Sequence, residues 1–567
     1  MTGILNVLLI IGAVLFMVFF FGMCVFVHEL GHFLAAKWRG LHIVAFSIGF
    51  KKVWSKTYHG VEYRIGCIPC GGYVDLPQID SSSDEKVVDG VTLPPAKPID
   101  RIITAAAGPL FNILFGLLLG VLVWYYGIPA SSPKMSKIVV ASVEAGSPEY
   151  RAGLRPGDVI VKLNGKTFHE NWQRFVSDVI FTVGEVKLTV KRDGKTFDIG
   201  YVPAANLNVM KQERIAVPFF QPLIPLKMYP REGSLAEQAG IRPGDILLAV
   251  NGRPVADFYE IHYLLGERDR ISMLVRRDGK DIEITGIVPK REVVADVYQL
   301  GVMFASTKPP TLEKVLPGSP AEKAGLKVGE QLLRIDNRPI DSTQQAIKLI
   351  AGSGGRTLTL ELLDHGKTLS RTVIPTPQVS YDIGVDFAAI EHPTPWQQLS
   401  DVVIMTGNAV RGIAYYLAHK AGVSQQSSTL KPSNLSGPLG IGRLIFQSVY
   451  HGSLIQGFYV IVMITFSLGL LNIMPIPVLD GGHIVMALLE MIFRRPVPAR
   501  ILQPVYVFFI TFLILFMIYV TVYDVFRFLP DSATGAAGKE VETEKSPAAA
   551  TTTKPTEAHH DAAPAHP

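Results

Sequence analysis

Long apolar runs without a charged side chain dominate the pattern of hydrophobic and polar positions along this chain. Four such runs cover Ile4 to Val27, Ile102 to Tyr126, Leu454 to Leu479 and Ile501 to Val522. Each exceeds the ~20 residues that a helix needs to cross the hydrocarbon core of a bilayer. The pattern therefore predicts four transmembrane helices. The first run continues into His28-Glu29 instead of a small-residue cleavage site, which favours a retained span over a signal peptide.

Between the second and third runs, the pattern changes to short alternating segments with an internal repeat. Copies begin at Gly146, Gly233 and Gly318, and each passes through Gly-Ser, Ala-Gly and a Gly-acid pair. Each copy is typical of a short helix with a glycine stop, a tight turn, a strand and a hairpin turn. The repeat resembles bacterial PDZ domains, which bind peptide ends by strand addition. The segment Leu300-Gly301-Val302-Met303-Phe304 looks like a PDZ carboxylate-binding loop, although a β-rich packing module without a ligand remains an alternative.

Three other segments have their own patterns. Residues 52 to 66 alternate on both sides of His59-Gly60, which predicts a β-hairpin. Residues 394 to 418 carry apolar positions at helical spacing, which predicts an amphipathic helix on the membrane surface. The tail after Leu529 is rich in Ala, Thr, Pro, Glu and Lys and has no periodicity, so it is predicted to be disordered.

Composition and charge narrow the function classes. The chain is 48% hydrophobic and only 18% charged, which agrees with a membrane protein. Its net charge of +5 is spread along the sequence and gives no support to a nucleic-acid partner. Only three cysteines occur, so no disulfide framework is expected, and the lone pair Cys67-x-x-Cys70 is a weak redox or metal signal.

Basic residues near the ends of the apolar runs predict the orientation in the membrane. Lys37, Arg39 and Lys51 follow the first run, and Arg494 and Arg500 lie between the third and fourth. Because cytoplasmic loops carry an excess of Lys and Arg, both short loops are expected to face the cytoplasm. The repeat-containing loop would then lie outside.

The candidate chemistry begins where the first apolar run ends, at His28-Glu29-Leu30-Gly31-His32. Residues four apart share one face of a helix, so His28 and His32 can bind one metal ion with Glu29 beside it. A zinc ion held by two histidines needs a third protein ligand. Asp480 is the candidate, because it lies in a run of prolines and glycines that cannot continue a helix.

The order of the spans predicts that these residues meet. The first and third spans must cross in the same direction. His28 lies 24 residues after Ile4, and Asp480 lies 26 residues after Leu454. Both distances correspond to roughly the whole bilayer core at about 1.5 Å per residue, so both sites are expected at one depth on the cytoplasmic side.

In these motifs, the chain resembles the site-2 protease family of intramembrane zinc metalloproteases. The resemblance is greatest to the bacterial branch of the family, the regulators of sigma E protease. The resemblance covers about residues 1 to 528 and departs from the better-known members in having three PDZ-like blocks instead of two. It implies that Zn²⁺ is bound by His28, His32 and Asp480 and that Glu29 is the catalytic base. It also implies substrate-binding positions, which are Asn472, Pro475, Pro477, Gly71, Gly72 and Tyr73.

The predicted fold is a multi-pass α-helical membrane protein with four transmembrane helices and β-rich PDZ-like domains inserted between the second and third. The expected segments are 1–37 (first span), 38–101 (cytoplasmic hairpin and membrane-associated loop), 102–128 (second span), 129–205, 206–292 and 293–390 (PDZ-like domains), 394–450 (surface helix and linker), 454–482 (third span), 483–500 (cytoplasmic loop), 501–528 (fourth span) and 529–567 (disordered tail).

The predicted function is cleavage of transmembrane segments of single-span proteins in a bacterial inner membrane. By resemblance, the expected substrate is an anti-sigma factor in envelope stress signalling. Two alternatives stay open from the residues. A catalytically inactive membrane scaffold could use its PDZ-like blocks to collect peptides, and a zinc transporter could use the histidine pair. A scaffold has no need for Glu29, and a transporter would need a relay of ligands through the other spans.

Overall fold

The computed structural model describes residues 2–528 except 80–85, 89–90, 131, 169–170, 207–213, 256–260, 262–263, 267, 306–308, 388 and 496. Among the described residues, four helices are long and apolar enough to cross a membrane, as the sequence predicts. They are α1 (Thr2–Trp38), α2 (Pro98–Tyr126), α11 (Leu454–Asn472) and α13 (Ala499–Phe528). The tail that is expected to be disordered lies outside the described residues.

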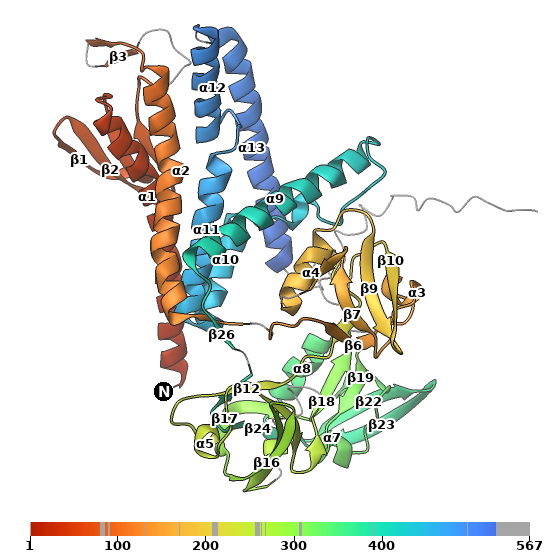
Figure 1. The fold of residues 1–567 in the computed structure, drawn as a ribbon. Coiled ribbons are helices and arrows are strands. Elements are labelled where there is room, and N and C mark those ends of the chain that lie inside the picture. Colours follow the sequence, from red (N-terminus) through yellow and green to blue (C-terminus); the bar gives the residue numbers. More distant parts are fainter. Residues whose placement is uncertain are drawn as a thin grey trace, which may run out of the picture.

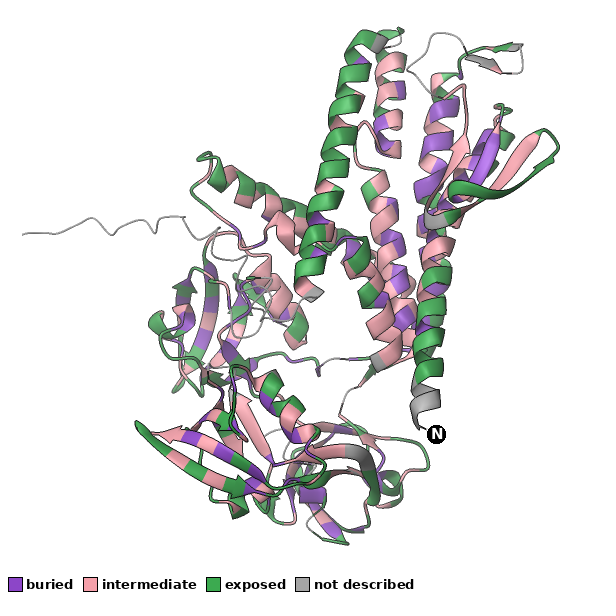
Figure 2. Cartoon of the chain, turned by 180° about the vertical axis from the view of Figure 1, so that it is seen from behind, coloured by how far each residue is buried: buried purple, intermediate pink, exposed green. Residues whose placement is uncertain are grey.

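Helix α2 is the central helix and packs against both α1 and α11 (Figure 1). Glycines allow the backbones to approach closely. A Cβ on Gly31 would lie 2.5 Å from the Ala107 carbonyl oxygen, and a Cβ on Gly116 would lie 2.5 Å from the Phe466 ring. In Figure 2, α2 therefore carries many buried positions, whereas α13 is mostly exposed.

The third span is broken where the prolines and glycines predict it. Helix α11 ends at Asn472, residues 473–479 form turns, and a new helix α12 (Asp480–Phe493) begins at the carboxylate. The prediction of a loop at 483–500 is therefore wrong over its first half, which is helical. Residues 484–493 are mostly apolar helix formers, and an acidic residue at the first position favours a helix start.

The predicted hairpin forms but is longer than expected. Strands β1 (Ala45–Tyr58) and β2 (Val61–Asp75) pair around a turn in which His59 has a φ of 49°. The start of β1 pairs on both sides, because Ser47 lies opposite both Arg64 and Tyr73. The segment 72–75 is consequently an outer strand of this small sheet. A short pair, β3 (Lys86–Val88) and β4 (Val91–Leu93), follows.

The loop between α2 and α11 folds into three β-rich units (Figure 1). The second and third lie near the N-terminal end of α1, whereas the first lies next to α9, where Arg174 faces Asp401. The first unit contains β6 (Ile138–Val143), α3 (Pro148–Arg151), β7 (Val159–Leu163), β8 (Lys166–Thr167), α4 (Trp172–Ile180), β9 (Val186–Arg192), β10 (Lys195–Tyr201) and β11 (Phe220–Pro222). Its sheet order is β10-β9-β7-β6-β11, with β8 paired to β7.

The second and third units are nested, which differs from the expected tandem order. The second unit contains β12 (Lys227–Pro230), α5 (Leu235–Gln238), β13 (Asp245–Val250), β14 (Arg253–Pro254), β15 (Ile271–Arg277), β16 (Lys280–Ile287) and β25 (Val385–Asp386). The third contains β18 (Val302–Ala305), β19 (Thr311–Val315), α7 (Pro320–Lys323), β20 (Gln331–Ile335), β21 (Arg338–Pro339), α8 (Thr343–Ala351), β22 (Leu358–Asp364) and β23 (Lys367–Val373). Strands β17 (Lys290–Gln299) and β24 (Thr376–Asp382) pair with each other as the chain enters and leaves the third unit.

The division expected at residue 293 therefore needs a correction. Strand β25 lies beyond the third unit in the sequence but pairs with β12, and Ile383 is buried in the core of the second unit. The second unit needs this distant strand to complete its sheet, whose order is β16-β15-β13-β12-β25. A sequence signal for the nesting exists, because residues 381–387 and 298–304 share the pattern Tyr-x-Leu/Ile-Gly-Val-x-Phe.

Helix α9 (Pro395–Lys420) confirms the predicted helix at 394–418 and starts with a capping box between Thr394 and Gln397. It also packs into the protein, because buried Gln398 donates from Nε2 to the Gly120 carbonyl oxygen of α2 at 3.1 Å. The remaining elements are β5 (Ile128–Pro129), β26 (Ile390–Glu391), η1 (Pro432–Asn434), α10 (Pro438–Gln447) and η2 (Ser448–Gly452).

Candidate metal centre

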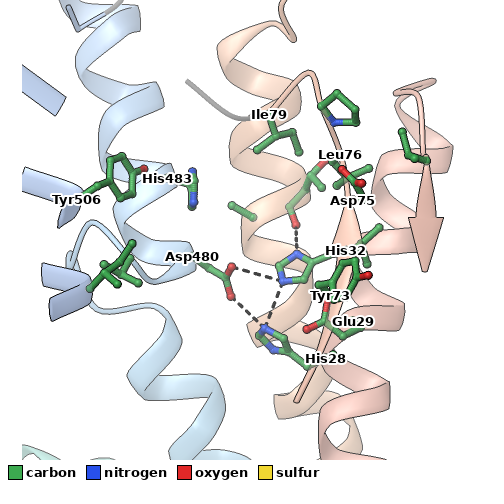
Figure 3. A pocket seen from close by; sticks show the side chains of 18 of the residues that line it. His28, Glu29, His32, Tyr73, Asp75, Leu76, Ile79, Asp480, His483 and Tyr506 are labelled. Carbon is green, nitrogen blue, oxygen red and sulfur yellow. Dashed lines mark hydrogen bonds and ion pairs between the residues drawn. The ribbon is translucent and has the colours of Figure 1, made fainter. Parts of the chain in front are cut away.

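Two histidines on α1 and one carboxylate at the start of α12 meet inside the helical part of the molecule (Figure 3). The Nε2 atoms of His28 and His32 lie 3.2 Å apart. Asp480 reaches both rings, with Oδ2 at 3.1 Å from His28 Nε2 and Oδ1 at 3.4 Å from His32 Nε2. The parity and depth argument from the sequence therefore predicts this meeting correctly, across more than 440 residues of chain.

The spacing of these atoms fits a tetrahedral zinc site. Zinc bonds to imidazole nitrogen and carboxylate oxygen are about 2.0–2.2 Å long, so neighbouring tetrahedral ligand atoms lie roughly 3.3–3.6 Å apart. The observed separations of 3.1 to 3.4 Å are close to that edge. All three residues are largely buried, and two imidazoles with a carboxylate are a donor set that zinc binds in catalytic sites.

Hydrogen bonds behind the rings also favour a cation in front of them. His32 Nδ1 lies 2.7 Å from the Thr104 carbonyl oxygen and donates to it, which leaves the lone pair of a neutral ring on Nε2. Among the described residues, this Nε2 faces the Asp480 carboxylate at 3.4 Å and His28 Nε2 at 3.2 Å, and both are acceptors when His28 also carries its proton on Nδ1. A metal ion converts this cluster of acceptors from repulsive to attractive.

Helix α2 supplies a third wall that the residue pattern alone does not assign. Thr104, Gly108 and Asn112 are spaced four apart and face the two histidines. A Cβ on Gly108 would lie 2.3 Å from His32 Nε2, so only glycine fits there. The glycine and asparagine belong to the run Ala107-Gly108-Pro109-Leu110-Phe111-Asn112, whose helical spacing is the signal that could have identified this wall.

Asn112 is fully buried, and its side-chain amide nitrogen lies 3.2 Å from His28 Nδ1. Its Oδ1 has no hydrogen-bond partner among the described residues. The two ends of an amide are assigned by the hydrogen-bond network and can be exchanged by a half turn. After that turn, Oδ1 accepts from the Nδ1–H of His28, and Nε2 of His28 keeps its lone pair for a metal ion.

Glu29 lies beside the cluster and faces the outer strand of the hairpin. A Cβ on Gly72 would be 2.9 Å from Glu29 Cγ and 2.8 Å from the Ser47 carbonyl oxygen, so the strand approaches the carboxylate as closely as glycine permits. The backbone amide of Val74 is directed at Glu29. Behind Tyr73, Arg64 donates to its hydroxyl at 2.7 Å.

Arg64 also anchors the hairpin electrostatically. It pairs with Glu62 at 2.5 Å, and Lys52 lies 3.0 Å from the same carboxylate. Hydrogen bonds from Arg64 and Lys52 lower the pKa of Glu62 to about 2. Glu62 is therefore ionised at neutral pH, and the Arg64 that contacts Tyr73 stays paired.

A cavity of about 1250 Å³ opens in front of the cluster. Its lining includes His28, Glu29, His32 and Asp480 from the predicted site, together with Gly72 and Tyr73. Opposite them, α12 and α13 contribute residues that sequence reasoning does not identify, namely His483, Gln503, Tyr506, Val507 and Ile510.

Of the other expected substrate-binding residues, one lies in the site and three lie beside it. Asn472, the last residue of α11, brings its amide nitrogen within 3.3 Å of His28 Nε2 and so belongs to the site. Pro475 and Pro477 lie in the break and are not among the described residues that line the cavity. Gly71 packs against Phe50, because a Cβ there would lie 2.4 Å from that ring. These three residues shape the backbone near the site.

Comparisons with known proteins agree with this geometry. The regulator of sigma-E protease RseP of Escherichia coli is 25% identical to the chain over 85% of its length and 91% of that protein. A protein of Vibrio cholerae whose name includes the words zinc metalloprotease has the same identity and coverage, and protease RseP of Yersinia pestis is 24% identical over 85% and 91%. The model of peptidase family M50 matches residues 16–517. The chain therefore belongs to peptidase family M50, the site-2 protease family of membrane zinc metalloproteases.

Proposed function

We propose that this zinc metalloprotease cleaves transmembrane segments of single-span membrane proteins at the His28, His32 and Asp480 cluster. The observation that carries the proposal is that these three ligand groups, from the C-terminal half of α1 and the start of α12, lie within 4.8 Å of one another. The cluster is bordered by apolar helices that are long enough to cross a membrane. An ionisable cluster in such surroundings is costly unless it has a function.

His28, His32 and Asp480 hold zinc in this proposal, and Asn112 and Thr104 fix the orientation of the two rings. Zinc, when bound, supplies the positive charge that activates water and polarises a carbonyl group. Glu29 lies at the edge of the same cavity, where its carboxylate can take a proton from the attacking water and return it to the leaving nitrogen. The low exposure of the His28 and Asp480 side chains, 11% and 19%, limits access of bulk water to the cluster.

A transmembrane substrate must unwind locally before cleavage, because the carbonyls of a helix are hydrogen-bonded and sterically covered. The outer strand at 72–75 lines the cavity and has one side free of β1 pairing. An unwound segment can pair with this strand by β-addition, which would lay its backbone beside Glu29. Gly72 and Tyr73 are the strand residues expected to contact it, and Asn472 is expected to help position it.

The proposed orientation has the metal cluster near the cytoplasmic face and the β-rich units outside. Figure 1 supports this arrangement, since the second and third units lie at the N-terminal end of α1 and the hairpin lies near its other end. The likeness to regulators of sigma-E protease supports an anti-sigma factor as the substrate class in an inner membrane. We further propose that the three β-rich units are PDZ-like domains that recognise peptide ends, on the basis of their repeated motif.

The proposed function predicts a specific change in the membrane proteome. Cells that carry Glu29→Gln in place of the wild-type chain should accumulate single-span fragments that retain an uncut transmembrane segment. Quantitative mass spectrometry of isolated membranes measures them. Equal amounts of every single-span protein in the two strains would contradict the proposal, and the accumulated fragments would otherwise identify the substrates.

The Asn112 contact predicts a change in zinc affinity. Replacing Asn112 with leucine removes the acceptor behind His28 and should weaken zinc binding about 10- to 100-fold, as loss of partners behind metal ligands does. Competition with a fluorescent chelator measures the affinity of the purified full chain. The control is Asn112→Asp, which restores an acceptor of similar size and should retain binding close to wild type. Equal affinities for the leucine variant and wild type would exclude a positioning role.

A further inference from the structure

The three β-rich units share one loop, which can be matched by its hydrogen bonds. In each unit, the carbonyl oxygen of the residue just before the edge strand accepts a hydrogen bond. The donor is the backbone N–H of the residue just after the neighbouring strand. These pairs are Glu144 N to Phe219 O at 2.9 Å, Arg231 N to Gly384 O at 2.8 Å and Leu316 N to Gly301 O at 2.9 Å. Phe219, Gly384 and Gly301 are therefore equivalent positions, and β11, β25 and β18 are the edge strands that follow them.

In the first unit, a side chain of the unit itself occupies this loop. The Phe219 N–H donates to Glu149 Oε1 at 3.3 Å, and Glu149 is only 2% exposed. The equivalent positions in the other units are the buried alanines Ala236 and Ala321. The residue before Phe219 is Pro218, which has no N–H to offer a ligand.

In the second unit, the equivalent amide donates to a carboxylate from a different position. The Gly384 N–H donates to Asp382 Oδ1 at 2.7 Å. The same oxygen lies 2.8 Å from Arg231 Nη2, so the carboxylate is held in place by an ion pair. Two units thus satisfy the equivalent amide with a carboxylate of their own, so the loop can accommodate a carboxylate.

In the third unit, no carboxylate of the described residues takes this position. Gln299 stands where the second unit has Asp382, and none of the described carboxylates accepts from the Gly301 N–H. Gln299 also lines a cavity of about 550 Å³ together with Arg291 and Lys323. The described residues that line this cavity include those two cations and no acidic side chain. Gly301 is not among the described residues that line this cavity, so these two cations bear on the loop through the neighbouring Gln299, beside which they favour an anion.

We infer that, of the three units, the third one binds the free carboxyl-terminal end of an extended peptide, whereas the first and second are closed by Glu149 and Asp382. The peptide pairs with the open edge of β18 and places its terminal carboxylate at the Gly301 amide. This inference rests on the proposed peptide recognition by the β-rich units. It is independent of the chemistry at the metal cluster.

Exchanging the residues at one position between units tests the inference. Gln299→Asp should close the third unit, because the new carboxylate occupies the Gly301 amide and repels the peptide end. Asp382→Gln should open the second unit. Both variants are made in the full chain, purified in detergent, and carry Glu29→Gln so that no peptide is cut. The probe is an immobilised array of random heptapeptides with free carboxyl termini, next to the same array with terminal amides.

The expected wild-type result is a set of peptides bound as free acids and not as amides. Gln299→Asp should weaken this binding about tenfold or more, which corresponds to the loss of one hydrogen bond to a charged group. Gln299→Asn is the matched neutral control and should bind like wild type, with all variants checked for unchanged thermal unfolding. Asp382→Gln should add a second set of bound peptides.

Two results would overturn the inference in different ways. Free-acid binding that is unaffected by Gln299→Asp would place the peptide elsewhere while leaving peptide recognition intact. Equal binding of acids and amides, or no bound peptide at all, would reject recognition of peptide ends by these units together with the inference. Neither result depends on protease activity, because the assay measures binding to a variant without the Glu29 carboxylate.

Discussion

Replacing Glu29 with glutamine is expected to reduce cleavage of a transmembrane substrate about 100- to 10,000-fold while bound zinc stays in place. The amide has nearly the shape of the carboxylate but cannot accept the proton of an attacking water. Glu29 is absent from the ligand cluster, whose three members are His28, His32 and Asp480. The measurement combines a gel assay of cleavage in reconstituted bilayers with metal analysis of the same purified sample.

The control for this experiment is Glu232→Gln, a matched exchange at an exposed position of the second β-rich unit. It should leave both cleavage and zinc content at the wild-type level. Cleavage by Glu29→Gln within a factor of a few of wild type would remove Glu29 from its proposed role as a base. Loss of zinc from this variant would instead assign Glu29 to metal binding, against the geometry of the cluster.

Replacing Asp480 with alanine is expected to release zinc and abolish cleavage together. One of three protein ligands is lost. The rest of the first turn of α12 consists of Gly481, Gly482 and His483, so it offers no second carboxylate to take the place of Asp480. The affinity for zinc should fall by more than about 100-fold, since even the loss of a partner behind a ligand costs 10- to 100-fold. Dialysis against buffered zinc followed by metal analysis measures it.

Asp75→Asn provides the control for Asp480→Ala, because Asp75 lines the same cavity but lies outside the ligand cluster. This variant should keep one zinc per chain. Full retention of zinc by Asp480→Ala would exclude a shared site between α1 and α12. A variant that binds zinc normally but no longer cleaves would move Asp480 from the metal to the substrate.

The sequence by itself determined the spans, the repeat and the members of the metal cluster. Span length and absence of charge are local properties, so the four helices follow directly from the pattern. The spacing of His28 and His32 puts them on one helix face, and the parity of the spans brings Asp480 to the same depth. These inferences need only the period of a helix and the thickness of a bilayer, and the observed distances agree with them.

The tertiary structure alone decided which faces of the helices meet and which distant strands pair. The rotation of α2 that turns Gly108 and Asn112 toward the histidines depends on close packing at Gly31 and Gly116. The start of α12 at Asp480 and the pairing of β25 with β12 across an inserted unit depend on contacts between residues far apart in the chain. Local propensity and periodicity carry no information on such contacts, because their free energy comes from burial and hydrogen bonding that exist only in the folded molecule.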